Sequence, residues 1–247
     1  MPMQPGQDPP KSVFQGDPDH FQAPRWPARA QQLLDAILRM CRDHLRQPLQ
    51  ACLSQFEQQL FTSADRARNS LEQQKLLTSR EQVLRHEAAL EARYFAEIKR
   101  RIEQIDSTPV AVVRALGNTW HELALVDPGE QELASTLDQI GARGESLHSG
   151  VLRDLSYRVA VLVAAPPLEG DGLPISPQSL VQAFQCASLP VQLPVSEQVQ
   201  LLRSFERNVI RMLTPLYEAV DSALASDGIL PQLHNARPLR HPTGRAP

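Results

Sequence analysis

Residues 71–106 read LEQQKLLTSREQVLRHEAALEARYFAEIKRRIEQID, and this stretch decides the fold. It contains neither glycine nor proline, and strong helix formers dominate it. Apolar residues recur at helical spacing, among them Leu90, Tyr94 and Ile98. The pattern predicts one helix of about 35 residues, which would be about 50 Å long. Such a length favours an antiparallel hairpin or an oligomer interface.

The sequence before this helix is helical as well. An apolar stripe over residues 28–47 includes Leu34, Ile37 and Cys41, and a second stripe runs from Leu49 to Ala64. Pro48 separates the two stripes and is expected to break or kink the helix, because proline lacks a backbone N–H and crowds the preceding turn. Residues 28–106 are therefore predicted to form a long helical hairpin.

Further helices are predicted after a joint at residues 107–127. Gly141 and Gly144 are expected to mark a stop or a bend. Ser176-Pro177 is a typical helix start, with a serine cap and a proline in the first turn. Pro215 should kink the last long helix. The helices predicted after the joint span about residues 128–140, 145–164, 176–189 and 196–227.

The predicted fold is all-α, a bundle of about seven helices without a strand. Residues 107–234 would form a C-terminal helical bundle packed on the hairpin. Residues 1–27 and 235–247 show no periodicity and are rich in proline and polar residues, so both are predicted to be disordered tails. Aromatic residues make up only 5% of the chain, which is typical of a core built from aliphatic side chains.

Composition narrows the classes of function. A net charge of -3 argues against a nucleic-acid binder and against a polybasic membrane-surface protein. Three cysteines without CxxC spacing indicate free thiols in a reducing compartment. No signal peptide is visible, and the longest apolar stretch is far shorter than the roughly 20 residues of a membrane span. A cytoplasmic location is expected.

No catalytic motif is present: GxSxG, GxxxxGK[ST] and GxGxxG are all missing. His44 and His86 lack partners at metal-ligand spacing, so we predict no metal and no cofactor. His121-Glu122 could pair a histidine with a carboxylate, but position 125 is leucine and HExxH is not completed. The ordinary interpretation is that Trp120 beside this pair is a packing anchor. The sequence indicates that the chain is not an enzyme.

Arg203, Arg207 and Arg211 recur every four residues on the predicted last helix, so they should share one helical face. A solvated face is the usual interpretation of such a run, and an interaction or anion-contact face is the alternative. Arg42 and Arg46 stand in the RxxxR spacing of the PilZ family, which binds cyclic di-GMP. The companion element of that family is missing, and the setting is helical.

Several segments resemble a bacterial family known as domain of unknown function 1631. They are LQACLSQFEQQLFTSADRARN (residues 49–69), ELALVD (122–127), ISPQSLVQAF (175–184) and LLRSFERNVIRMLTPLYEAVDSALASDGILPQL (201–233). Asp221 stands where the family pattern often has asparagine. The resemblance implies an all-α fold and a proteobacterial cytosolic protein, and it brings no established activity. Members are several hundred residues longer, so the chain resembles the N-terminal helical module. Some relatives are labelled thymidine phosphorylase, but this chain has no glycine-rich phosphate loop.

Three hypotheses of function follow. The first is a non-enzymatic interaction or regulatory module that binds a protein partner, or itself, through helices. The second is a sensor for a small anionic ligand such as a cyclic dinucleotide, and the third is an enzyme of unrecognised type. An interaction module would show an exposed apolar patch, a sensor would show arginines clustered in a cleft, and an enzyme would show a convergent polar pocket.

Overall fold

The computed structural model describes residues 26–105, 128–168 and 170–233, which form an all-helical bundle without β-strands. Three 3-10 helices connect the main elements: η2 (Gly170–Gly172), η3 (Leu189–Val191) and η4 (Ile210–Met212). The α-helices of the described part are six: α1 (Ala28–Asp65), α2 (Ser70–Glu103), α4 (Pro128–Val163), α5 (Pro177–Ser188), α6 (Val195–Asn208) and α7 (Thr214–Ser226).

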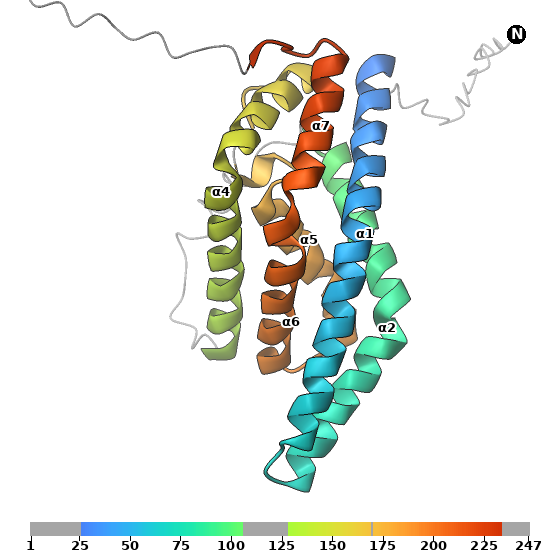
Figure 1. The fold of residues 1–247 in the computed structure, drawn as a ribbon, viewed down its shortest axis with the longest axis vertical. Coiled ribbons are helices and arrows are strands. Elements are labelled where there is room, and N and C mark those ends of the chain that lie inside the picture. The colour runs from blue at the N-terminus through green and yellow to red at the C-terminus, as the bar shows by residue number, and fades with distance from the viewer. Residues whose placement is uncertain (1–25, 106–127, 169, 234–247) are drawn as a thin grey trace, which may run out of the picture.

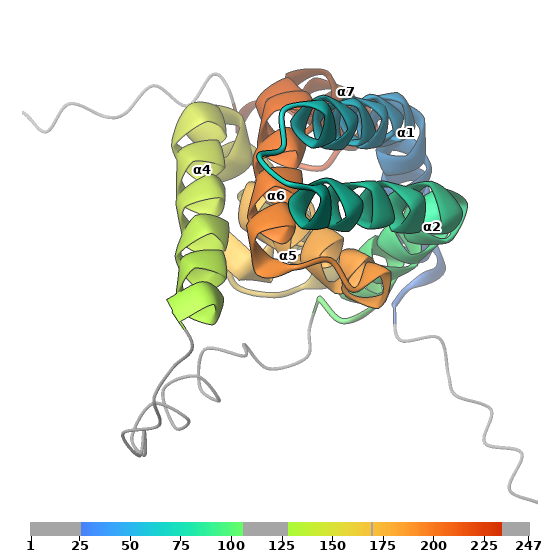
Figure 2. The ribbon, with the colours of Figure 1, turned by 90° about the horizontal axis from the view of Figure 1, so that it is seen from below.

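The predicted helical hairpin is present. α1 and α2 run antiparallel along one side of the bundle, and their turn projects beyond the other helices (Figures 1 and 2). Arg46 on α1 pairs with Glu91 on α2 at 2.8 Å. Asn69 caps α2 by accepting a hydrogen bond from the Glu72 backbone N–H, and the Glu72 carboxylate accepts one from the backbone N–H of Arg68. These two reciprocal hydrogen bonds, a variant of the capping box, fix the turn between the two helices.

Pro48 does not break the first helix. α1 is continuous from Ala28 to Asp65 with Pro48 inside it, so the two predicted segments are one helix. A proline inside a helix costs about 3 kcal/mol. Leu45, Leu49 and Cys52 are almost fully buried on either side of it, and their burial holds the helix together across the lost hydrogen bond.

Gly141 and Gly144 do not stop a helix either, because both lie inside the uninterrupted α4. Their role is close packing. A Cβ at position 144 would stand 2.5 Å from the Cβ of Pro177 and 2.7 Å from the Cγ2 of Ile210. The missing side chain therefore lets α4 approach the start of α5 and η4 at a distance that no other residue would allow.

The predicted last helix is two helices. α6 ends at Asn208, η4 follows, and α7 begins at Thr214 with Pro215 in its first turn. Proline suits the first turn of a new helix, because the N–H that it lacks would have no helical partner there. Buried Val209 and Leu213 anchor the break in the core. Two predicted pairs of helices are each a single helix, and one predicted helix is two helices. The described part therefore has six α-helices where the sequence predicted about seven.

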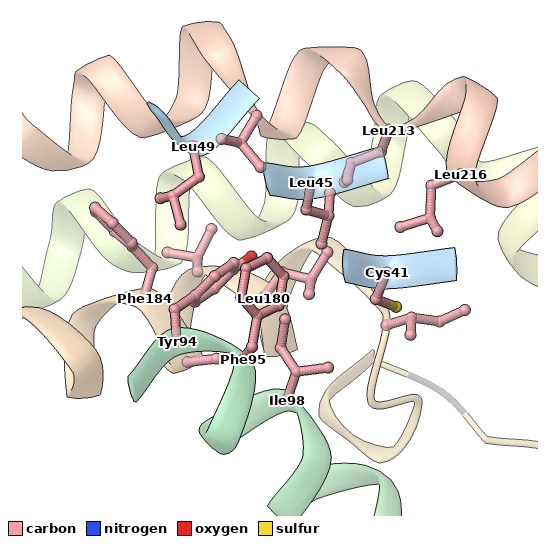
Figure 3. Close-up of a cluster of buried hydrophobic side chains, with 14 of the residues drawn as sticks. Cys41, Leu45, Leu49, Tyr94, Phe95, Ile98, Leu180, Phe184, Leu213 and Leu216 are labelled. Carbon is pink, nitrogen blue, oxygen red and sulfur yellow. The ribbon is translucent and has the colours of Figure 1, made fainter. Parts of the chain in front are cut away.

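The predicted tails and the joint at residues 107–127 lie outside the described residues, apart from Trp26 and Pro27. Trp26 is buried against the core. One continuous cluster of buried apolar side chains receives residues from all six α-helices. Figure 3 shows its centre, where Cys41, Leu45 and Leu49 of α1 face Tyr94 of α2. Phe184 of α5 stacks on Phe205 of α6 at 4.0 Å, and the edge of the Tyr94 ring meets both.

Two buried tyrosines of this core give a matched test of hydrogen-bond satisfaction. The Tyr94 hydroxyl is buried without a hydrogen-bond partner, whereas the Tyr217 hydroxyl donates to the Ile175 carbonyl at 2.9 Å. Tyr94→Phe is expected to leave the free energy of unfolding unchanged or to raise it, because it removes an unsatisfied polar group. Tyr217→Phe should lower it by about 1–2 kcal/mol, because a buried carbonyl loses its donor. Urea denaturation of both variants checks this, and a larger loss for Tyr94→Phe would contradict it.

Candidate functional site

A groove of about 560 Å³ lies between the C-terminal half of α1 and α6. Three arginines, four glutamines and two hydroxyl side chains line it: Arg66, Arg203, Arg207, Gln55, Gln58, Gln59, Gln200, Thr62 and Ser63. No acidic side chain and no histidine, cysteine or lysine belongs to this lining. The groove therefore offers positive charge and neutral hydrogen-bonding groups together.

Helical periodicity assembles the groove. The α1 residues that line it recur at helical spacing from Gln55 to Ser63, and Arg66 follows as the C-cap, so together they form one polar stripe. The neighbouring stripe carries Phe56 and Leu60, which are fully buried and hold α1 on the core. Two polar contacts keep α6 against α1: the Ser204 hydroxyl donates to the Cys52 carbonyl at 3.3 Å, and the Asn208 amide donates to Gln55 at 2.6 Å.

The arginines of the groove are not neutralised. Arg66, Arg203 and Arg207 are exposed, and none forms an ion pair within the described part of the chain. Other arginines of this protein do have carboxylate partners, such as Arg46 with Glu91 and Arg101 with Glu97. Three unpaired guanidinium groups along one groove attract anions.

Arg211 lies elsewhere, although the sequence places it on the same face as Arg203 and Arg207. Because α6 ends at Asn208, Arg211 faces a second hollow of about 290 Å³, which Arg143 and Leu147 also line. Its guanidinium stands 3.8 Å from the Glu206 carboxylate, and Arg143 stands 3.4 Å from the same group. Glu206 thus offsets part of the positive charge of this second hollow. The structure brings Arg203 and Arg207 together and separates Arg211 from them.

The remaining residues singled out from the sequence are dispersed. Arg46 of the RxxxR pair is engaged with Glu91, far along α1 from the groove. His86 bonds through its Nδ1 to the Gln82 carbonyl of its own helix at 2.8 Å. His121 and Glu122 lie outside the described residues. His148, which the sequence analysis did not consider, is buried and hydrogen-bonds the Ile210 carbonyl at 2.9 Å through Nε2.

Arg66 and the glutamines are the groove residues that sequence analysis missed. The available signal was the spacing of Gln55, Gln58 and Gln59 with Arg66, a polar stripe that flanks the apolar stripe of α1. Such a stripe on a single helix has the same appearance as an ordinary solvated surface. Only the packing of α6 against α1 shows that it borders Arg203 and Arg207.

The two buried thiols of the described part, Cys41 and Cys52, are poorly reactive. Burial raises the pKa of Cys41 and of Cys52 to about 12, and for Cys52 this exceeds the lowering caused by Ser204 and Arg207. Both thiols therefore remain protonated at neutral pH, and a protonated buried thiol is a poor nucleophile. Within residues 26–105, 128–168 and 170–233, no three His, Cys, Asp or Glu side chains are grouped to hold a metal ion.

No helix of the described ranges combines the length and the apolar character needed to cross a bilayer. No curated protein and no solved structure matches the chain. One family model does match, over residues 29–228, and its description is "Protein of unknown function (DUF1631) N-terminal domain". The match covers most of the 247 residues and includes all six described α-helices except the first residue of α1. The chain therefore belongs to the DUF1631 family, of which it carries the N-terminal domain.

Proposed function

We propose that this chain is a non-enzymatic interaction module that binds an acidic segment of a partner protein in the groove between α1 and α6. The observation that carries the proposal is the lining, which holds Arg66, Arg203 and Arg207 and no carboxylate. Arginine is the side chain best suited to pair with carboxylates, through two parallel hydrogen bonds. The partner that complements this surface carries aspartate or glutamate.

Clustered arginines would also serve a sensor of a small anionic ligand, but the shape of the groove favours the interaction module, because it suits an extended ligand. The stripe from Gln55 to Arg66 spans about 16 Å at 1.5 Å per residue. Sites for small molecules enclose most of the ligand surface, whereas all three arginines of this groove are exposed to solvent. The glutamine amides both donate and accept hydrogen bonds, which suits the polar groups of a peptide laid along the groove. A segment of about ten residues in helical form covers this length.

The chemistry of the lining supports a non-enzymatic role. General acid–base catalysis requires a group that exchanges protons near neutral pH, and nucleophilic catalysis requires an activated hydroxyl, thiol or amine. Arginine keeps its proton throughout this range. Thr62 and Ser63 have no base beside them in the lining. Binding is what this set of side chains does best.

The test is fluorescence anisotropy of a labelled glutamate-rich helical peptide titrated with the protein. Arg203→Glu/Arg207→Glu is expected to weaken binding about tenfold or more, since it converts two attractive charges into repulsive ones. Binding should also weaken as salt rises from low to physiological ionic strength.

Arg39→Glu/Arg42→Glu is the matched control, because it changes two exposed α1 arginines outside the groove by the same charge. Equal losses for the two double variants would mean that net charge governs binding and not the groove. A cyclic dinucleotide that binds tightly, competes with the peptide and depends on Arg203 and Arg207 would replace this proposal with the ligand-sensor hypothesis.

A further inference from the structure

The outer face of α4 is unusual for a helix of a monomer. α4 stands at one edge of the bundle, and no other described helix covers its outer side (Figures 1 and 2). Tyr157 and Val161 on this helix are 44% and 56% exposed. They fall within one sector of the helix together with Gly150, because the angles between these residues around the helix axis are small. Exposed apolar side chains on an uncovered helix face gain free energy when a second molecule buries them.

Small residues lie along the same outer face. Ala142, Ser146 and Gly150 are exposed and follow one another at four-residue spacing, so they stand one above the other. A Cβ at position 150 would meet nothing within 4 Å, so packing inside the chain does not require glycine there. Glycine inside a helix costs about 1 kcal/mol relative to alanine. Small residues at this spacing allow a second helix to approach the backbone closely.

A second copy of α4 fits this face when the two helices run antiparallel and cross at Ser146. In that arrangement Ala142 of one copy lies opposite Gly150 of the other, four residues from the crossing point. Gln139 lies opposite Arg153, seven residues or about 10 Å from it. Small side chains therefore meet where the helices are closest, and long polar side chains meet where they diverge.

The charges on the face also suit an antiparallel copy. Every exposed acidic residue of α4 precedes Ser146, and Asp138 is the nearest of them, eight residues away. Arg153 follows Ser146 by seven residues and lies on the same flank of the helix as Asp138. In an antiparallel dimer, Asp138 of one copy and Arg153 of the other lie at nearly the same height along the helix axes, offset by one residue. They can therefore form an ion pair across the contact. A two-fold axis duplicates the pair.

The present contacts leave both side chains available. Asp138 is exposed and has no ion pair in the described part of the chain. Arg153 is 73% exposed, and its only described ion pair is with its neighbour Asp154 at 4.0 Å. Arg143, the other exposed arginine of this helix, is 3.4 Å from the Glu206 carboxylate, which offsets its charge near the crossing point.

We propose that the outer face of α4 is a homodimer interface, in which two copies of α4 cross antiparallel at Ser146. The interface is separate from the groove between α1 and α6, because no α4 residue lines that groove. The proposal does not depend on the groove having a ligand. A dimer formed this way would present two grooves to a partner protein.

Light scattering over a concentration series tests the dimer. The wild type is expected to approach twice the chain mass of 27.5 kDa at high concentration. Asp138→Arg and Arg153→Asp should each raise the dimer dissociation constant about tenfold or more, because each places like charges together twice. Combining the two substitutions restores opposite charges and should restore the dimer.

Gly150→Leu provides a second measurement. It should dissociate the dimer by filling the space beside the crossing point, while the melting temperature of the monomer stays equal or rises, because leucine is a better helix former. Leu84→Glu on the exposed side of α2 is the control and should leave the dimer intact. A monomer at every concentration, a dimer that Leu84→Glu dissociates, or a double charge exchange that fails to restore association would each overturn the proposal.

Discussion

Arg158→Met is expected to lower the free energy of unfolding by about 3–5 kcal/mol, the typical cost of removing one partner of a buried ion pair. The Arg158 side chain is 1% exposed and lies 2.7 Å from the Asp221 carboxylate, outside ideal hydrogen-bond geometry. Its guanidinium also donates to the carbonyls of Ile229 and Leu230. The residue joins α4 to α7 and to the turn after it, and methionine keeps much of its volume without its charge.

The double variant Arg158→Met/Asp221→Leu separates the two contributions to this loss. It removes both charges, so it should be less destabilised than Arg158→Met alone. The comparison uses urea denaturation followed by circular dichroism. The free energy of unfolding lost by the double variant is compared with the sum of the losses for Arg158→Met and Asp221→Leu alone. If the two are equal, the pair has no coupling energy and this explanation fails.

Gly144→Ala is expected to cost about 1–3 kcal/mol through overpacking, because the new methyl group would overlap Pro177 and Ile210. Neither neighbour is the free end of a long side chain, so α4 must shift away from α5. Two other glycines of the same helix are matched controls. Gly150→Ala should stabilise the monomer by up to about 1 kcal/mol, since its site is open.

Gly141→Ala should fall between these two variants. Its new methyl group would overlap mainly the amide end of the Gln178 side chain, which can swing away. The measurement is thermal unfolding of the three variants side by side at low protein concentration, where the chain is monomeric. A Gly144→Ala variant as stable as Gly150→Ala would show that the close approach of α4 and α5 does not need glycine.

The spacing of apolar residues along the sequence was sufficient to predict an all-α fold. The helix boundaries that it did not predict depend on packing between residues far apart in the sequence. The helix at residues 71–106 is visible in the sequence because its apolar spacing and composition agree. The break predicted at Pro48 and the stop predicted at the two α4 glycines were wrong, because each rests on a local preference that tertiary contacts override. Pro48 lies between buried Leu45 and Leu49, and Gly144 lies against Pro177. Neither neighbourhood can be derived from adjacent residues.

The candidate site was accessible only in part for the same reason. Arg203 and Arg207 could be identified from their four-residue spacing on one helix. Arg211 follows the same spacing, but the helix ends before it, and Pro215 alone predicted a kink further along. Arg66 lies more than a hundred positions from Arg203 and Arg207 in the sequence. The sequence pattern of each helix shows which of its faces is buried, but not which other helix packs there. It therefore contains no signal that pairs α1 with α6.

The distance along the chain between α1 and α6 also has a kinetic consequence. α1 and α2 follow one another in the sequence and are joined by a capped four-residue turn, so pairing them requires a short loop to close and costs little conformational entropy. The contact between Ser204 and Cys52 joins residues 152 positions apart. A chain that has closed its hairpin but not docked α6 has only one wall of the groove. Recognition of a partner would therefore begin only when the end of this domain has been made and has folded back onto its beginning.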